Sequence, residues 1–443
     1  MPPKTEAITT RGRGLTPRLR AAPVSIGQRL RRGLRALRPT GPRSRLAVLL
    51  GLFGPGLIAA AAGNDAGGIA TYTNIGATYG YTLLWSLPLI AISLCIVQEM
   101  SARLGAVTGK GLADLIREEF GVRWTAFAML ILLIANGGTT IAEFAGISAA
   151  LGLFGISKWL AVPAMAVLVW LIVVRFSYKI AEKVFLALSA VFIVYPIAAF
   201  LVHPHWATVA HATIVPHLQG GGDFIRDLIT LVGTTITPYM QLFLQSAVVD
   251  KGVTADEYGE ERTEVIVGSL LSIFVAATIV IVCATTLNAR GIQVQTAADA
   301  AQALEPIVGP AAGVLFGLGL FGASMLAASI LPLSTSYAIS EAFGFERGIS
   351  RSFREAPVFF GLYTGMIVLG AGVVLLPVDP IGVILLSQLI DGILLPIVLI
   401  FILLLVNDRS VMGHHVNGRV LNAIAWCTAA LLIGLTAVWL GSA

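Results

Sequence analysis

Charged residues are scarce in this sequence: only 12% of its 443 residues are Asp, Glu, Lys or Arg, and 56% are hydrophobic. The mean hydropathy is +0.86. A water-soluble protein of this length could not bury so much apolar surface, so we expect a polytopic α-helical membrane protein. The apolar runs are also far longer than the alternating segments of about 10 residues in an outer-membrane barrel, which excludes that class.

Cysteine is nearly absent too. Cys95, Cys283 and Cys427 stand alone in apolar runs, which excludes a disulfide framework and a thiolate metal site and predicts buried free thiols. The six histidines lie in predicted loops, at spacings that do not match a zinc site. The chain has no HExxH motif and no nucleophile–base pair, so it is not expected to be an enzyme.

Acidic residues are almost missing from the N-terminal arm. Residues 1–45 contain twelve Lys and Arg residues and one acid, Glu6. The arm has no hydrophobic region of the kind that a signal peptide needs. It also has no aromatic residues between its basic ones, so nucleic-acid binding is not expected. We predict a disordered cytoplasmic tail that contacts anionic lipid; an Arg-rich organellar transit peptide is the alternative.

Hydropathy predicts about eleven membrane-spanning helices within a transporter domain at 46–442. Their ranges are 47–77, 82–103, 124–154, 157–175, 180–202, 224–249, 264–288, 311–342, 357–377, 380–406 and 419–440. If the basic arm is cytoplasmic, the loops on its side hold fourteen Lys and Arg residues and the external loops hold three. This bias predicts a multi-pass protein of the plasma or inner membrane, with its N-terminus inside and its C-terminus outside. Segment 294–309 is expected to be an external amphipathic helix.

The first and sixth spans contain residues that interrupt helices. Glycine weakens a helix by about 1 kcal/mol relative to alanine, and proline removes a backbone donor. Because each span opens a block of five, the paired breaks predict an inverted-repeat transporter with a site at mid-membrane. The repeats would cover about 46–203 and 222–408, followed by an extra helix at 419–440. The expected break residues are Gly63, Gly67, Gly233 and Pro238.

Three acids lie at membrane depth, namely Asp65, Glu143 and Asp391, and no Lys, Arg or His lies at a matching depth. Such a carboxylate must be protonated, face water or bind a cation. Asp65 is expected to be a cation ligand; a helix N-cap is the alternative, and the two roles are compatible. Glu143 and Asp391 are expected to serve a proton or secondary pathway, or else to hydrogen-bond a neighbouring helix. Glu99, near the cytoplasmic end, is expected to pair with Arg103.

Several stretches resemble the Nramp family of divalent metal transporters. They include "GPGLIAAAAGNDAGGIATYTNIGATYGYTLLW" and "VQEMSARLGAVTGKGLADLIREEFG", and the run from Gln98 to Lys110 is the most specific part. Further matches are "TTIAEFAGISAALGLFG", "SEAFGFERGISRSFREAPVFFGLYTG" and "SQLIDGILLPIVLIFILLLVND". The resemblance runs from about residue 45 to 408. It implies the LeuT-type fold, which has two inverted five-helix repeats with discontinuous helices 1 and 6, plus one extra helix.

The chain departs from the family pattern at the expected metal site. The family's Asp-Pro-Gly-Asn motif reads Asp-Ala-Gly-Gly here, so the asparagine ligand is lost. Thr237 replaces the metal-binding methionine, and the family's histidine after the proline is missing, which leaves proton coupling open. The resemblance implies a site of oxygen ligands at Asp65, Thr234, Thr237, Gln241 and Gly68. Such ligands favour Mg²⁺ or Mn²⁺; rotation of Met240 into the methionine's role is the alternative.

These features predict a secondary transporter that moves a divalent cation inward by alternating access. The cation would be the substrate, and no resident cofactor is expected. Two other hypotheses remain open. One is a sodium-coupled symporter of a small organic solute with the same fold, and the other is a metal sensor or scaffold that does not transport. The sequence does not determine the oligomeric state.

Overall fold

The computed structural model describes residues 64–174, 190–346, 348 and 352–442, and in these ranges the secondary structure is entirely helical. Seven helical segments there are long and apolar enough to cross a membrane. Their bounds are Ser86–Thr108, Leu112–Gly152, Tyr258–Arg290, Ala297–Phe343, Pro357–Leu375, Pro380–Asn407 and Arg419–Ser442. The basic arm, the predicted break at Gly63 and parts of the first and fifth spans lie outside the described residues.

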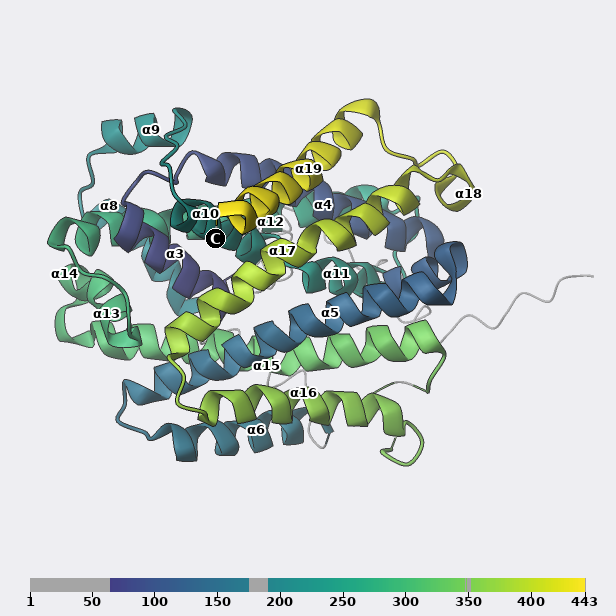
Figure 1. The fold of residues 1–443 in the computed structure, drawn as a ribbon, viewed down its shortest axis with the longest axis horizontal. Helices are drawn as coiled ribbons and strands as arrows, with labels where there is room; N and C mark the ends of the chain where they lie inside the picture. Colours follow the sequence, from purple (N-terminus) through teal and green to yellow (C-terminus); the bar gives the residue numbers. More distant parts are fainter. Residues whose placement is uncertain (1–63, 175–189, 347, 349–351, 443) are drawn as a thin grey trace, which may run out of the picture. The chain divides into compact units, whose positions relative to one another are not determined.

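The helices form two packed groups joined by α17. The first group contains α3 (Ala66–Tyr79), α4 (Ser86–Thr108), α10 (Gly222–Thr235), α11 (Pro238–Lys251) and α12 (Tyr258–Thr286). The second group contains α5 (Leu112–Gly152), α6 (Lys158–Val174), α15 (Ala312–Phe343) and α16 (Pro357–Leu375), which lie side by side in the lower half of Figure 1. Helix α17 (Pro380–Asn407) packs against α5, α10 and α3, and α19 (Arg419–Ser442) packs on α17.

Shorter elements fill the connections, and two of them differ from the predictions. The segment expected to be one amphipathic helix contains α13 (Ala297–Ala301), η3 (Gln302–Leu304), α14 (Glu305–Val308) and η4 (Gly309–Ala311). The histidine-rich loop contains a helix that the sequence did not predict, α9 (Trp206–Ile214). The remaining short elements are η1 (Ala190–Ile193), α8 (Val194–Leu201), η2 (Asn288–Arg290) and α18 (Arg409–Met412).

Two of the predicted break positions are wrong. Gly67 is the second residue of α3, and Gly233 lies inside α10. A Cβ atom at Gly233 would overlap the Gln388 carbonyl and the backbone of Gly392, so this glycine allows α10 to approach α17 closely. Pro238 is correctly placed, since it is the first residue of α11. A kink that the sequence did not predict occurs in α5 at Gly121, whose φ of 76° favours glycine.

The prediction of buried thiols is right for one cysteine only. Cys283 is buried, Cys95 is half-buried and Cys427 is exposed. The histidines also differ from one another in position, because His211 lies in the last turn of α9 and not in an irregular loop. These differences arise where a helix lies at the edge of the packed groups, since hydropathy alone does not show which face of a helix meets its neighbours.

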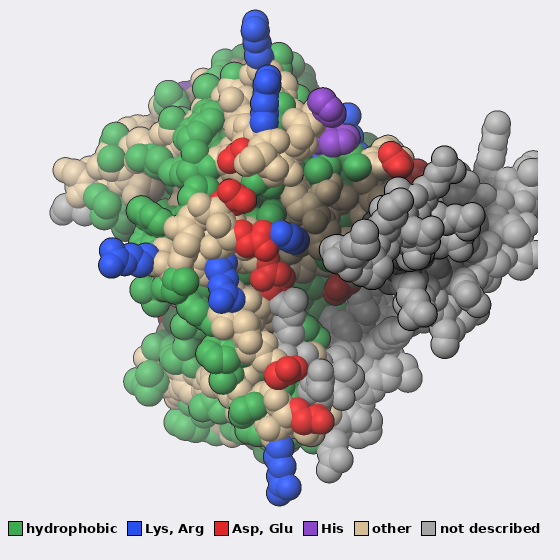
Figure 2. All heavy atoms as spheres, turned by 90° about the vertical axis from the view of Figure 1, so that its right-hand side faces the viewer, with side chains coloured by type: hydrophobic (Ala, Val, Ile, Leu, Met, Phe, Trp, Pro, Cys, Tyr) green, Lys and Arg blue, Asp and Glu red, His purple; other side chains and the backbone are tan. Residues whose placement is uncertain are grey.

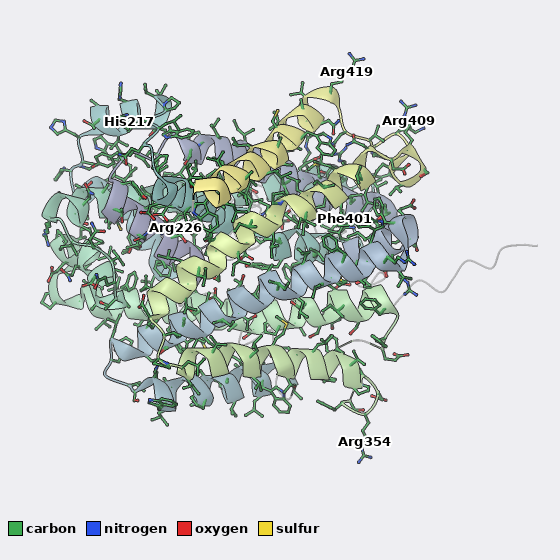
Figure 3. All side chains as sticks on the ribbon, viewed as in Figure 1. His217, Arg226, Arg354, Phe401, Arg409 and Arg419 are labelled. Carbon is green, nitrogen blue, oxygen red and sulfur yellow. The ribbon has the colours of Figure 1, made fainter. Side chains whose placement is uncertain are left out.

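Charged side chains gather at one end of the helices. Figure 2 shows this end, where α5 begins and α15 and α17 end, with Lys, Arg, Asp and Glu side chains among hydrophobic ones. Arg354, Arg409 and Arg419 lie there, away from Arg226 and His217 (Figure 3). The predicted pair between Glu99 and Arg103 is confirmed, with 3.3 Å between Arg103 Nε and Glu99 Oε1.

Candidate functional site

The sixth span is broken between α10 and α11. Ile236 and Thr237 have non-helical backbone angles, and α11 restarts at Pro238. Since proline has no N–H, the carbonyl of Thr234 cannot receive the usual bond from the residue four positions later. The Thr234 hydroxyl is also buried, without a hydrogen-bond partner among the described residues. The hydroxyl of Thr237 lies beside that of Tyr239. The break therefore gathers oxygen atoms at the negative end of α10.

Asp65 lies at the start of α3, directly before its first residue. Its Oδ1 accepts a hydrogen bond from Gly68 N at 2.9 Å, so the aspartate is a helix N-cap. Its Oδ2 is buried and has no partner in the described part of the chain. One oxygen thus holds the helix while the other is available to a cation. Metal ligation by Gly68 stays a prediction, since the structure places its amide on Asp65.

Glu143 reaches the same helix end from α5. Its Oε2 accepts from Ala66 N at 3.4 Å, and the side chain is fully buried. The hydroxyl of Ser324, on α15, lies beside this carboxylate, and Asp65 is close enough for the two negative charges to repel each other. The positive end of α3 stabilises both acids. The structure therefore brings two of the three predicted membrane acids together at one helix terminus.

Two further residues at this centre were not predicted from the sequence. Gln388, on α17, is fully buried; its amide lies so close to Gly67 that a Cβ there would overlap it. Its Oε1 has no partner among the described residues, while its Nε2 donates to Ser387 Oγ at 3.0 Å. Tyr239 is buried within electrostatic range of Asp65, Glu143 and Asp391. Its position directly after Pro238 was the signal that could have identified it.

The other predicted residues take different places. Gln241 is fully buried, and its Oε1 accepts from Ser101 Oγ at 3.3 Å. Ser101 belongs to the motif run on α4, so this contact gives that run a structural role. Asp391 faces α5, where Thr139 Oγ1 lies 2.8 Å from its Oδ2. Met240 packs in an apolar cluster with Tyr239, Ala327 and Leu331, so its thioether is engaged in hydrophobic packing in this conformation.

Beyond this centre, hydrogen bonds join α3, from the first broken span, to α10, from the sixth. Tyr72, on α3, shares a 3.0 Å hydrogen bond with Thr235, on α10. Further along α3, the Tyr79 hydroxyl donates to Asp227 Oδ2 at 3.0 Å, and Arg226 Nε donates to the other oxygen of Asp227 at 2.8 Å. Asp65 is only 2% exposed. The contacts between α3 and α10 are consistent with this burial, because they close the space next to the start of α3.

The chemistry of the centre suits a hard cation held by few protein ligands. In the described ranges, no group of three or more His, Cys, Asp or Glu side chains could hold a metal ion. The available atoms are carboxylate, hydroxyl, amide and carbonyl oxygens, which suit Mg²⁺, Ca²⁺ and Mn²⁺. With so few ligands, an ion would keep part of its water shell, as Mg²⁺ usually does.

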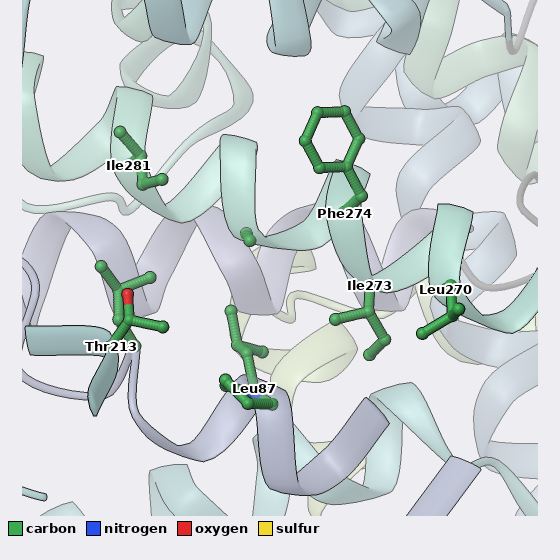
Figure 4. A pocket seen from close by; sticks show the side chains of 9 residues that line it. Leu87, Thr213, Leu270, Ile273, Phe274 and Ile281 are labelled. Carbon is green, nitrogen blue, oxygen red and sulfur yellow. The ribbon is translucent and has the colours of Figure 1, made fainter. Parts of the chain in front are cut away.

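A separate cavity of about 220 Å³ lies between α4, α9 and α12 (Figure 4). Its lining is apolar except for Thr213, whose hydroxyl donates to the Val209 carbonyl of its own helix at 2.8 Å. It therefore offers no ligand for a cation. Asp65 and the break at Pro238 do not line it.

Comparisons with known proteins give concordant results. Residues 56–442 match the model of the natural resistance-associated macrophage protein-like (Nramp) family. The divalent metal cation transporter MntH of Ralstonia nicotianae is 31% identical over 440 residues, covering 96% of this chain and 97% of the relative. MntH of Deinococcus radiodurans is 30% identical over 413 residues, covering 89% and 90%.

Solved structures share the fold. A mutant of the Eremococcus coleocola manganese transporter aligns with a TM-score of 0.73 at 21% identity, covering 90% of this chain and 88% of that one. Mhp1, a nucleobase-cation-symport-1 family transporter, aligns with a TM-score of 0.53 at 12% identity, covering 88% and 92%. These likenesses confirm the predicted LeuT-type arrangement of a multi-pass membrane protein.

Proposed function

Because this chain belongs to the Nramp family, we propose that it is a secondary transporter that carries a divalent cation across the membrane by alternating access. One observation supports this most strongly. Asp65 has one buried oxygen without a hydrogen-bond partner among the described residues, in the centre where the break at Pro238 frees the carbonyl of Thr234. The first helix group, with α3, α10 and α11, would rock against the second group around this centre.

The proposed cargo is Mg²⁺ or Mn²⁺, taken up inward. Asp65, Thr234, Thr237, Gln241, Gln388 and Gly68 are the candidate ligands. The packing of Met240 among apolar side chains supports a site without sulfur, and oxygen ligands favour these ions over softer transition metals.

Transport would proceed without obligatory proton coupling. Among the described residues, the groups that act on Glu143 are Asp65, the Ser324 hydroxyl and the amides at the start of α3, and none of them is cationic. Gly370 of α16 lies tightly against Phe144 and Thr140, on either side of Glu143 along α5. Tyr239 follows Pro238 where the family has a histidine, and a tyrosine hydroxyl rarely exchanges a proton near neutral pH.

The proposed orientation places both the basic arm and the charged end of Figure 2 in the cytoplasm, with the C-terminus outside. The positive-inside rule and the common location of Arg354, Arg409 and Arg419 support it. The twelve basic residues of the arm would contact anionic lipid, each worth about 1 kcal/mol near a charged surface. Liposomes with and without anionic lipid would test this contact, using a chain that begins at residue 46 as the control.

The organic-solute hypothesis is less well supported. A symporter of that kind needs a free helix N-terminus for the anionic group of its substrate. The N-terminus of α3 is occupied by Asp65 and Glu143 of the chain itself. A metal sensor would bind the cation without moving it, and the experiment below separates this outcome.

The test is cation flux into proteoliposomes that contain a pH dye, comparing Mg²⁺, Mn²⁺, Ca²⁺ and Fe²⁺. We expect uptake of Mg²⁺ and Mn²⁺ without acidification. D65N should lower the uptake rate by about 100-fold, because loss of a buried charged partner costs roughly 2–5 kcal/mol. D379N is the control, because it removes only the charge of an exposed N-cap at the start of α17 and an asparagine can still cap the helix. Binding without uptake would favour the sensor, and full activity of D65N would refute the proposal.

A further inference from the structure

Asp391 lies in a polar cluster between α17 and α5, one turn beyond Gln388 along α17. The side chain is fully buried. Its Oδ2 is 2.8 Å from Thr139 Oγ1, and its Oδ1 has no partner among the described residues. Asn136 and Thr139 share one face of α5, since they are three residues apart. We define the cluster as Asp391 on α17, Asn136 and Thr139 on α5, and Thr335 on α15, all of them buried.

The hydrogen atoms of this cluster can be counted. Thr335 Oγ1 donates to the Leu331 carbonyl at 2.8 Å, so it accepts from Asn136 Nδ2 at 2.6 Å. This fixes the Asn136 amide and leaves its Oδ1 as a buried acceptor without a partner among the described residues. Thr139 has a single hydroxyl hydrogen but two acceptors in reach: Asp391 Oδ2, and the Ala135 carbonyl at 3.1 Å. The cluster therefore has more acceptors than donors.

An ionised Asp391 would worsen this shortage. A buried carboxylate needs several hydrogen-bond donors or a cationic partner. Asp391 has one donor within reach among the described residues, the hydroxyl of Thr139. The titratable groups within electrostatic range of it are Asp65 and the hydroxyl of Tyr239, neither of them cationic. A single proton on the carboxyl lets both contacts of Thr139 form at once. Thr139 then donates to Ala135 of its own helix, as helical threonines commonly do, and accepts from Asp391.

We infer that Asp391 carries a proton throughout the transport cycle and acts as a neutral hydrogen-bond donor that positions α17 against α5. The residues on either side of Asp391 along α17 contact the two broken helices. Gly392 lies so close to Ile229 of α10 that a Cβ there would be 2.5 Å from the Ile229 carbonyl, and Gln388 lies against Gly67 of α3. The stretch 388–392 thus contacts both broken helices while Asp391 bonds to α5.

The inference also balances the charge of the centre, a point that rests on the proposed function. With Asp391 neutral, ionised Asp65 and Glu143 together match the charge of one divalent cation. A third negative charge would leave the loaded centre with a net charge inside the membrane, which is costly. Asp391 is therefore a positioning residue and neither a metal ligand nor the carrier of a coupled proton.

The experiment compares D391A and D391N in full-length protein. An asparagine can donate where the protonated acid donates, whereas an alanine cannot. We expect D391A to lower the initial rate of Mn²⁺ uptake by about tenfold, as loss of a buried hydrogen bond predicts, and D391N to restore it to within about twofold. If D391N is as inactive as D391A although it elutes as folded protein, Asp391 ionises during transport and the inference is wrong.

A second readout does not depend on transport. The infrared spectrum of the parent should contain the C=O band of a protonated, buried carboxyl group that is absent from D391N. The band should shift in T139V, which removes the Thr139 hydroxyl and keeps the shape of the side chain. Absence of any band assignable to Asp391 would overturn the inference. If the parent moves no cation, the proposed function fails while this spectrum still decides the protonation of Asp391.

Discussion

Two of the regions where the described chain buries acids differ in the partners that they give to these acids. At the charged end of α4, one oxygen of Glu99 has both a cationic partner and a hydroxyl donor. Arg103 Nε lies 3.3 Å from Glu99 Oε1, and the Tyr258 hydroxyl donates to the same oxygen at 2.6 Å. Arg103 also donates to the carbonyl of His415 at 2.6 Å and to the side chain of Asn417. In the centre of the helices, Asp65, Glu143 and Asp391 have no cationic partner among the described residues.

The comparison teaches how to separate structural from functional charges in a membrane protein. A buried acid with a resident base joins helices together, and its removal costs stability. A buried acid without a base has to bind something that comes from outside, or remain protonated. For Asp65, the family membership of the chain and the nearby helix break favour the binding of a cation from outside. For Asp391, the number of hydrogen-bond donors and acceptors around the carboxyl group favours a carboxyl that remains protonated.

The largest expected effect would test the paired region. E99A should lower the free energy of unfolding by about 3 kcal/mol, because it leaves the buried Arg103 without its carboxylate. The melting temperature in detergent measures it. Uptake per folded molecule should stay near that of the parent, in contrast to D65N.

The matched control for E99A is E118A. Glu118 also forms an ion pair, with Lys110, but both side chains are nearly half exposed. Exposed pairs contribute about 0–1 kcal/mol, so this variant should melt close to the parent. Equal melting of E99A and E118A would show that burial of the Glu99 pair carries no special cost, and the comparison would lose its basis.

A smaller effect would test how tightly the unpaired centre is packed. G233A places a methyl group against the backbone of α17, and overpacking of this kind costs about 1–3 kcal/mol. A lower melting temperature together with a lower uptake rate is expected. G361A is the control, because a Cβ at Gly361 of α16 meets no atom within 4 Å. If both variants melt alike, the close approach of α10 to α17 does not matter.

The smallest expected effect concerns selectivity. T237M would place a thioether in the break, and sulfur favours softer metals over Mg²⁺. The ratio of Mn²⁺ to Mg²⁺ uptake should rise by about tenfold, equivalent to roughly 1.4 kcal/mol of preference. The control is T230M, which places a methionine within α10, about two turns before Thr237. An unchanged ratio would argue that Thr237 does not face the cargo.

Parts of the fold could be predicted from the sequence because hydropathy acts locally. The long helices α4, α12, α15, α17 and α19 lie close to the predicted spans, since about 20 apolar residues suffice to specify a crossing. Pro238 marked one break correctly, because it lacks the N–H that would continue the helix; proline alone does not decide this, since Pro332 and Pro396 lie inside α15 and α17. Gly67 and Gly233 misled, because a glycine can weaken a helix or let another helix approach. Only the neighbour, Gln388 or Gly392, decides between these roles.

The sequence by itself therefore determined the class of protein, the family pattern and the presence of acids without bases in the membrane. These follow from composition, motif and depth, which are properties of single segments. Only the tertiary structure decided how the acids are used. It placed Glu143 beside Asp65 at the start of α3, brought Gln388 and Tyr239 to the same centre, and set Asp391 against Thr139. Those relations join helices that are far apart in the chain, and no local pattern records them.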